Sequence, residues 1–286
     1  MDFFRAVVLG IVQGLTEFLP VSSSAHLRLV PALLGWDDPG AAFTAVVQLG
    51  TVTAVVIYFW SDLWRIANTW LRSLRDPSLR QELDARMGWY LVIGTIPISI
   101  LGLAFKDQIS TGARDLRIIG STLIVLGVVL LIADRIGKRT KELDELGTRD
   151  GVAIGLAQAM ALVPGVSRSG STISAGLFLG YTREAAARYS FLLSIPAVVL
   201  SGLFELKDVG SGGSYGLVPT AVATVLAFIV GYASIAWLLR YLVHHSVAVF
   251  VGYRIAVGAL VLALVATGTL VANTPFAGNY LHTIHR

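Results

Sequence analysis

The sequence contains no cysteine and little charge. Without cysteine, the chain of 286 residues forms no disulfide and has no thiolate for catalysis or metal binding. Asp, Glu, Lys and Arg make up only 14% of the residues, whereas soluble domains carry about 25%. Hydrophobic residues make up 55% of the chain. This balance argues against a soluble protein and predicts an all-α, multi-pass membrane protein.

The distribution of charge also limits the partners. The formal net charge is +4, and the chain has no run of six like charges of the kind that binds nucleic acid. We therefore expect no nucleic-acid partner. The small basic excess is better explained by membrane topology or by contact with anionic lipid headgroups.

Long runs that are nearly free of charge predict the membrane-spanning helices. A hydrocarbon layer of about 30 Å requires about 20 apolar residues in a helix. Arg117, Arg188 and Arg254 fall within such runs but toward one end, where we expect them to snorkel to the interface. The six predicted spans are 41–60, 87–105, 116–133, 185–206, 217–239 and 246–272.

Two further apolar stretches, 6–34 and 151–180, are interrupted near their middle by proline, serine and ionisable residues. Proline removes a backbone donor and disrupts the preceding helical turn. Backbone that leaves the helix at membrane depth must find partners in protein or in a water-filled cavity. We expect each stretch to be a re-entrant helix-loop-helix element, and a kinked ordinary span is the alternative.

An internal repeat relates the two stretches at one offset of 145 residues. Each half would hold one broken segment and three spans, and an odd number of spans inserts the second half upside down, as in transporters. We therefore expect a single membrane domain, 1–286, built from inverted halves of about 1–145 and 146–286. The matching pairs are Val7 and Val152, Gly10 and Gly155, Gln13 and Gln158, Val21 and Val166, Ser22 and Ser167, and Ser24 and Ser169.

The positive-inside rule predicts the orientation. The predicted loop 61–86 carries five arginines, and the predicted loop 134–150 carries three arginines and two lysines. The predicted loops 106–114 and 207–215 carry fewer cations. Both termini are therefore expected outside the cytoplasm. The small residues Gly252, Ala256 and Gly258 allow close helix packing, so a homo-oligomer is possible.

The first broken segment contains the reactive side chains. Gln13 and Glu17 are four residues apart and share one face of a helix. An ionisable side chain at membrane depth is expensive and indicates a functional site, although Glu17 could instead cap or bridge helices. His26 could be structural, but beside a carboxylate and the hydroxyls of Ser22, Ser23 and Ser24 it gains weight as a general acid or base.

The second broken segment has the composition of an anion site. Its glycines permit close backbone approach, and hydroxyls with free amides at the start of a helix can cradle an anion. Arg168 adds a planar fork that suits phosphate oxygens. If the repeat is inverted, the two loops meet near the midplane of the membrane. The hydroxyl-bearing candidates for phosphate binding here are Ser167, Ser169 and Thr172.

Carboxylate, imidazole, hydroxyl and guanidinium groups together form a set suited to phosphoryl transfer. The arginine and the helix N-termini would hold the anion, a hydroxyl could attack phosphorus, and Glu17 or His26 could move protons. A lipid phosphate is the natural substrate in a membrane, because its tail stays in the bilayer while its headgroup enters the site.

Segments 13–26 and 164–172 resemble the two signature motifs of the bacterial undecaprenyl-diphosphate phosphatase family, which also confers bacitracin resistance. The first motif has Glu or Gln, three residues and Glu, followed by Pro-Val-Ser-Ser. The second is Pro-Gly-x-Ser-Arg-Ser-x-x-Thr. The chain contains both, and the Val-Val-Gln-Leu-Gly run at 46–50 also resembles a stretch typical of the family. The resemblance covers essentially the whole chain.

The resemblance implies hydrolysis of undecaprenyl diphosphate in the bacterial inner membrane, at a site facing the periplasm, with a divalent cation (Mg²⁺ or Ca²⁺) as cofactor. Carried over by position, it implies Ser23 as nucleophile, Glu17 and His26 beside it, and Arg168 on phosphate. Glu17 is also the implied metal ligand. Gln13 stands where many relatives have Glu, so a metal would lose one carboxylate. Ser24 and Ala25 replace the Thr and Gly often found there.

Two questions stay open from the residues. Attack on phosphorus could come from Ser23 or from an activated water. The second question is the class of protein, because inverted repeats with broken helices are more typical of carriers than of enzymes. A lipid-phosphate transporter or flippase is therefore the alternative function.

Overall fold

The computed structural model describes residues 2–105, 115–205 and 216–272, and all regular elements within them are helices. The all-α prediction is confirmed. The elements are α1 (Phe3–Phe18), α2 (Ser23–Leu34), α3 (Gly40–Tyr58), α4 (Trp60–Ser73), η1 (Pro77–Gln81), α5 (Leu83–Ala104), α7 (Leu116–Ile136), η2 (Leu143–Glu145), α8 (Thr148–Ala159), η3 (Met160–Leu162), α9 (Arg168–Phe178), α10 (Arg183–Glu205), α11 (Leu217–His244) and α12 (Ala248–Ala266).

Four of the described helices, α5, α7, α11 and α12, are long and apolar enough to cross a membrane. A fifth span results if α3 and α4 are counted as one segment that bends by 72°. The chain is therefore a multi-pass membrane protein. Helices α3 and α10 occupy the other two runs for which the sequence predicts spans.

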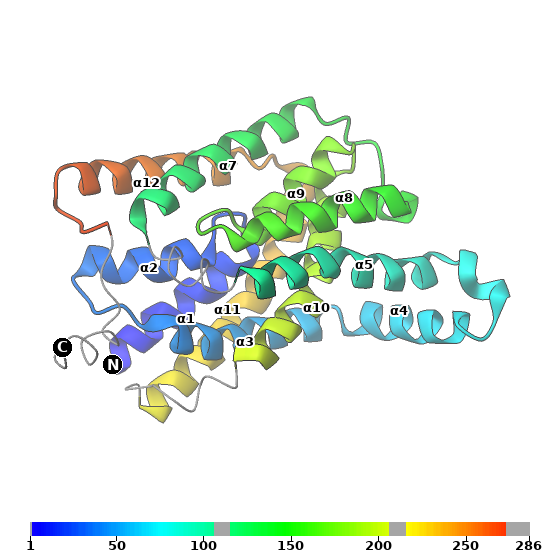
Figure 1. Cartoon of the computed structure of the whole chain (residues 1–286), viewed down its shortest axis with the longest axis horizontal. Coiled ribbons are helices and arrows are strands. Elements are labelled where there is room, and N and C mark those ends of the chain that lie inside the picture. Colours follow the sequence, from blue (N-terminus) through cyan, green and yellow to red (C-terminus); the bar gives the residue numbers. More distant parts are fainter. Residues whose placement is uncertain (1, 106–114, 206–215, 273–286) are drawn as a thin grey trace.

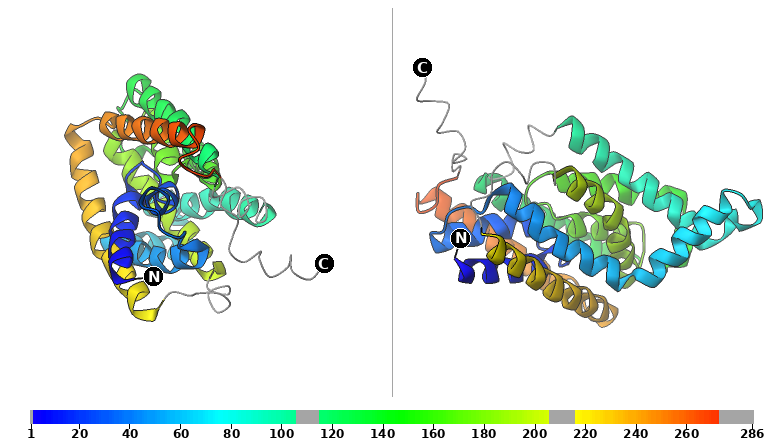
Figure 2. Two further views of the ribbon diagram at one scale, coloured as in Figure 1. Left: turned by 90° about the vertical axis from the view of Figure 1, so that its left-hand side faces the viewer. Right: turned by 90° about the horizontal axis from the view of Figure 1, so that it is seen from below.

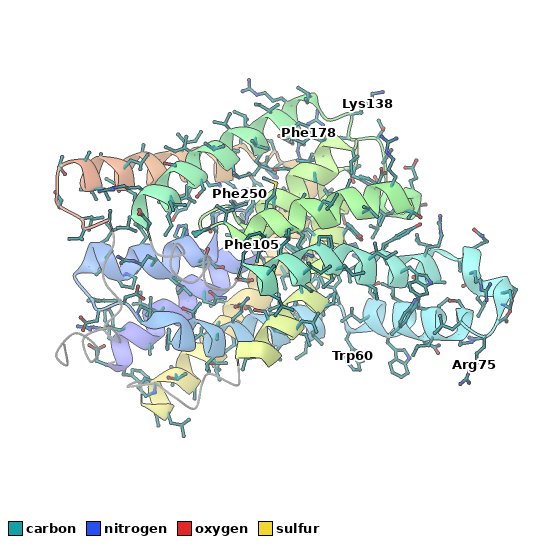
Figure 3. All side chains as sticks on the ribbon, viewed as in Figure 1. Trp60, Arg75, Phe105, Lys138, Phe178 and Phe250 are labelled. Carbon is teal, nitrogen blue, oxygen red and sulfur yellow. The ribbon has the colours of Figure 1, made fainter. Side chains whose placement is uncertain are left out.

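The basic stretch 61–86, predicted as a loop, is mostly helical. It forms α4, η1 and the start of α5, which together extend as an arm to the right of Figure 1. One of its arginines is paired within this stretch, because Arg65 donates to Asp62 at 3.2 Å and to Asp84 at 2.7 Å. Figure 3 places Trp60 near the base of the arm and Arg75 at its far end. The predicted loops 106–114 and 207–215 lie outside the described residues.

The second predicted basic loop, 134–150, is shorter than expected. Helix α7 continues to Ile136 and α8 already begins at Thr148. Asp134 lies in the last turn of α7, and Arg183 pairs with its carboxylate through Nε at 2.5 Å and Nη2 at 3.0 Å. Lys138 lies toward the right of Figure 3, the side to which the arm with Arg75 extends. Both basic regions therefore lie toward the same end of the molecule.

Each broken segment is a pair of helices joined by a short loop, as predicted. Helix α1 contacts α2, and α8 contacts α9. In Figure 1 the pair α1–α2 enters from the left and turns back, whereas α8–α9 enters from the right and turns back. The two loops therefore approach each other from opposite ends of the molecule.

The two halves of the chain interlock. Helix α1 packs along α11 of the other half, and α8 packs along α5. The repeated glycines lie where these backbones approach most closely. A Cβ atom on Gly10 would lie 2.5 Å from the Ala223 carbonyl oxygen, and one on Gly155 would lie 2.4 Å from the Cα atom of Gly94. Only glycine permits such contacts, which explains why both repeats have it at this position.

Helices α7 and α12 pack side by side next to the two broken segments (Figures 1 and 2). Buried apolar residues of α2, α7 and α12 form one cluster that includes Leu29, Leu123 and Val261. Helix α7 also contacts α9. The α7–α12 pair therefore supports both loops and fixes where they meet.

Candidate active site

Glu17 lies at the centre of a buried polar cluster at the end of α1. Gln13, one turn earlier, donates through Nε2 to Glu17 Oε2 at 3.1 Å and to Thr51 Oγ1 of α3 at 3.4 Å. The reverse orientation of the amide would place its oxygen against the carboxylate, so chemistry fixes the assignment. The Gln13 Oε1 atom is buried and has no hydrogen-bond partner. The shared helix face predicted for these two side chains is confirmed.

Ser23 begins α2 and is directed at the same carboxylate. Its hydroxyl donates to Glu17 Oε2 at 2.6 Å. The preceding residue, Ser22, has a left-handed φ of 77° and caps α2 by accepting from the Ala25 amide at 3.5 Å. Its hydroxyl lies 3.2 Å from that of Ser24. The sharp turn at Ser22 therefore brings the Ser23 hydroxyl back over the end of α1.

Arg168 reaches Glu17 from the second broken segment. Its Nη2 atom donates to Glu17 Oε1, and the two side chains are 17% and 7% exposed. The Glu17 carboxylate therefore receives donors from three directions: an amide, a hydroxyl and a guanidinium. The predicted meeting of the two loops is confirmed by this contact.

The second loop repeats the geometry of the first. Ser167 has a left-handed φ of 71° and accepts from the Gly170 amide at 3.1 Å, as Ser22 does from Ala25. Its hydroxyl lies 3.2 Å from that of Ser169, the same separation as between Ser22 and Ser24. Ser169 then donates to the Leu19 carbonyl at 3.2 Å and so joins the two loops.

Thr172 is not brought to this cluster by its contacts. Its hydroxyl lies 2.6 Å from that of Ser190 on α10 and donates to the Arg168 carbonyl at 2.8 Å. It is fully buried. In this conformation Thr172 ties α9 to α10.

His26 contacts α12 rather than Glu17 or Ser23. A carbonyl can only accept, so Nδ1 donates to the Ser22 carbonyl at 2.8 Å. In the neutral imidazole the other nitrogen, Nε2, then accepts from the Tyr253 hydroxyl at 2.7 Å. The two rings stack, with centroids 5.5 Å apart. Tyr253 was not identified from the sequence. The one sequence feature that could have pointed to it is its position next to an arginine within an apolar run.

Arg254 does not snorkel to the interface, and that prediction is wrong. Its side chain is fully buried, with 0% exposure. The guanidinium donates to the backbone carbonyls of Pro20 at 3.0 Å, Gly165 at 3.0 Å and Val166 at 3.1 Å. These carbonyls leave regular helix geometry at the two loops and need donors. They hold the guanidinium inside the protein.

The other two arginines for which snorkelling was predicted differ from Arg254. Arg117 is exposed on α7. Arg188 is 37% exposed and donates to Asp62 Oδ2 at 2.6 Å, which ties α10 to α4.

The described residues include no group of three or more Asp, Glu or His side chains that could hold a metal ion by themselves. The Glu17 carboxylate offers oxygen donors, and Gln13, which faces it with Nε2, has a buried, unpartnered Oε1 on the other side of its amide. Mg²⁺ and Ca²⁺ bind through oxygen, and Mg²⁺ commonly takes most of its ligands from phosphates and water. The residues present therefore fit a cation that is bound together with a phosphate substrate.

As a whole, the cluster combines an oriented hydroxyl, a carboxylate that can accept its proton, and a guanidinium that can bind an anion. These are the groups required for attack on a phosphorus atom.

Comparison with known proteins agrees with this chemistry. The family model described as "Bacitracin resistance protein BacA" matches residues 6–260. The chain belongs to this family. Three similar relatives align with this chain over almost their whole length. The undecaprenyl-diphosphatase of a Nocardioides species is 59% identical over 273 residues, covering 95% of this chain and 100% of the relative.

The other two relatives come from Streptomyces avermitilis and Thermobifida fusca. Undecaprenyl-diphosphatase 2 of Streptomyces avermitilis is 56% identical over 282 residues, covering 94% of this chain and 97% of the relative. The undecaprenyl-diphosphatase of Thermobifida fusca is 54% identical over 278 residues, covering 97% of this chain and 94% of the relative.

Proposed function

We propose that this BacA-family protein hydrolyses undecaprenyl diphosphate to undecaprenyl phosphate and inorganic phosphate, which recycles a cell-wall lipid carrier and confers bacitracin resistance. The observation that carries the proposal is the Glu17 carboxylate, which accepts from both Ser23 and Arg168. The relatives are named for this hydrolysis. Their names favour an enzyme over a lipid-phosphate transporter or flippase.

The geometry supports two routes for the chemical step. In the first, Ser23 Oγ bonds to the terminal phosphorus as its proton passes to Glu17, and the bridging P–O bond breaks to release undecaprenyl phosphate. Water then hydrolyses the phosphoserine and regenerates the Ser23 hydroxyl. In the second, a water molecule held near Glu17 attacks directly and the same P–O bond breaks. The short Ser23–Glu17 hydrogen bond of 2.6 Å favours the first route.

Arg168 is suited to bind the phosphate oxygens during either route, because a planar guanidinium matches them in two places. Gln13 donates to the carboxylate that Ser23 also contacts, Ser22 and Ser24 flank Ser23 in the sequence, and Ser167 and Ser169 lie at the second loop. These polar groups would complete the binding of the diphosphate, and Thr172 would hold Arg168 in place.

His26 has a supporting role in this conformation. Both ring nitrogens are engaged, one by the Ser22 carbonyl and one by Tyr253. It therefore holds the turn that presents Ser23, and it would transfer protons only after the Tyr253 contact opens.

A divalent cation, Mg²⁺ or Ca²⁺, would be held by Glu17 together with substrate oxygens, and by Gln13 Oε1 once its amide turns its oxygen toward the carboxylate. Such a cation would neutralise charge on the diphosphate. The shared helix face of Glu17 and Gln13 does not depend on the cation.

The proposed placement in the membrane combines six spans with the two broken segments as re-entrant elements. The opposed entry of α1–α2 and α8–α9 in Figure 1 supports an inverted repeat within a single membrane domain. The basic ends at Arg75 and Lys138 support a cytoplasmic location for that side. The termini would then face the periplasm of the bacterial inner membrane, where the site would open.

The test is phosphate release from undecaprenyl diphosphate by the purified protein in detergent, with and without a chelator. Release that stops in chelator and returns with Mg²⁺ or Ca²⁺ is the expected result. No release under any of these conditions would contradict the phosphatase assignment. Movement of the substrate across sealed vesicles without hydrolysis would favour the transporter instead.

A further inference from the structure

Arg254 is a buried cation whose hydrogen bonds, in the part of the chain that the structure describes, all go to backbone carbonyls. It lies on α12 with 0% exposure. Two of its contacts, to Leu123 at 3.1 Å and Thr122 at 3.4 Å, anchor it to α7. The remaining contacts reach the loops of both broken segments. A buried charge is costly unless such contacts satisfy it, so its place in an apolar helix calls for an explanation.

The carbonyls that Arg254 binds are related by the internal repeat. Pro20 and Gly165 are separated by the repeat offset of 145 residues, and each carbonyl accepts from the guanidinium at 3.0 Å. Nη1 serves the first loop and Nη2 serves the second. One guanidinium therefore bridges equivalent points of the two halves.

These points lie just before the reacting groups. Pro20 precedes Ser23 by three residues, and Gly165 precedes Arg168 by three residues. The first turn of α9 also leaves room for the guanidinium, because a Cβ atom on Gly170 would lie 3.1 Å from Arg254 Nη1. The position of Ser23 relative to Arg168 is thus tied to one side chain that contacts neither.

We propose that Arg254 is a positioning residue that sets the spacing between Ser23 on the first loop and Arg168 on the second. Only a planar fork with several donors serves both loops at once, and lysine, a point charge on a flexible stem, does not. The inference rests on the proposed phosphatase function for its kinetic consequences, but the spacing itself can be measured without substrate.

The kinetic experiment compares Arg254→Lys and Arg254→Gln with the wild-type protein on undecaprenyl diphosphate. Lysine keeps the charge, whereas glutamine avoids leaving an unpaired charge buried. A displacement of about 1 Å at a reacting group can cost about 100-fold in rate, so we expect kcat to fall by about that factor and KM to change less. Arg240→Lys is the matched control, because Arg240 is an exposed arginine on α11.

A double-mutant cycle separates positioning from general loss of structure. If Arg254 acts through the spacing of Arg168, then Arg168→Lys combined with Arg254→Lys loses little more activity than the more damaging single substitution. The proposal would be overturned if the fold-losses in activity of the two single substitutions multiplied in the double variant. An Arg254→Lys protein with normal kcat would also overturn it. So would a loss of activity matched by an equal loss of folded protein in thermal unfolding.

The substrate-free experiment uses the lack of cysteine. Spin labels on Leu33→Cys of α2 and Phe178→Cys of α9, both exposed positions, report the distance between the broken segments. Arg254→Gln should shift or broaden this distance distribution, whereas Arg240→Lys should not. An unchanged distribution overturns the positioning role even if the phosphatase assignment holds. A wild-type protein inactive on undecaprenyl diphosphate would instead contradict the function and leave this distance test in force.

Discussion

The Glu17 carboxylate and the Arg168 guanidinium form an ion pair between residues 151 positions apart in the sequence. The pair joins the end of α1 to the start of α9, and neither side chain is well exposed. Breaking a buried pair by removing one charge leaves the other uncompensated. In the proposed reaction the pair would therefore serve catalysis and the folded structure through the same atoms.

Glu17→Gln should abolish most of the activity and also destabilise the protein. The amide cannot accept a proton from Ser23, and loss of a general base typically costs about 100-fold or more in rate. Arg168 is left without its counter-charge, which we expect to lower the free energy of unfolding by about 3 kcal/mol. Phosphate release and thermal unfolding in detergent measure both effects. The control is Asp144→Asn, because Asp144 is an exposed acidic residue. If Glu17→Gln kept more than a tenth of the wild-type activity, Glu17 would not be the general base.

Ser23→Ala should reduce turnover by at least about 1000-fold if its hydroxyl is the nucleophile. Folding should be preserved, because the hydroxyl forms one hydrogen bond, to Glu17. Rapid quenching with labelled substrate, followed by mass spectrometry, should find phosphate on Ser23 in the wild type. Ser78→Ala on η1, in the arm, also removes a hydroxyl that donates to a carboxylate, that of Asp76, and should leave turnover unchanged. A wild type without phosphoserine, together with substantial turnover by Ser23→Ala, would favour attack by water.

Tyr253→Phe should weaken catalysis modestly, because it removes the hydrogen bond to His26 while retaining the stacked ring. One such bond contributes about 1 kcal/mol, which corresponds to roughly a fivefold loss in kcat. The loss should disappear in a His26→Ala background, since Tyr253 acts through the imidazole. Tyr232→Phe on α11, whose ring packs on Tyr58, is the matched control. Equal effects of Tyr253→Phe with and without His26 would show that the hydroxyl acts elsewhere.

The sequence predicts the two broken helix pairs and the meeting of their loops, because Pro20, Ser23 and Glu17 are conspicuous in apolar surroundings. The pair Ser22 and Ser167, matched by the shared offset, also adopts the same left-handed φ. These features depend on local sequence alone.

The residues that were predicted wrongly or missed have surroundings that are set by distant parts of the chain. Arg254 in an apolar run can either snorkel or be buried, and the choice depends on carbonyls up to 234 positions away. Tyr253 gained a role only because α12 packs beside α2. The arm containing Arg65 reads as a basic loop, but its pairing with Asp84 of α5 stabilises a helix there.

Gly155→Ala should destabilise the fold, because its Cβ would lie 2.4 Å from the Cα of Gly94 and backbone cannot easily move away. Overpacking of this kind costs about 1–3 kcal/mol. Gly252→Ala is an internal control of the same chemistry, since nothing lies within 4 Å of its added Cβ. Thermal unfolding should show a lower Tm for Gly155→Ala and an unchanged or higher Tm for Gly252→Ala. A Tm for Gly155→Ala at or above that of the wild type would contradict the close approach of α8 and α5.

Gln13→Glu tests the proposed cation site. The Gln13 side chain contacts the Glu17 carboxylate through Nε2, and its Oε1 atom is buried without a partner. A second carboxylate at this position would strengthen binding of a divalent cation through its charge. We expect the concentration of Mg²⁺ or Ca²⁺ that gives half-maximal phosphate release to fall by about tenfold, equivalent to about 1.4 kcal/mol.

In chelator the same variant should be less stable than the wild type, because two adjacent carboxylates repel each other when no cation lies between them. Added cation should restore its Tm. Gln81→Glu on η1, an exposed position, controls for the added charge. If Gln13→Glu left both the cation requirement and the Tm in chelator unchanged, Gln13 would not border the cation, and Glu17 with the substrate would have to hold it alone.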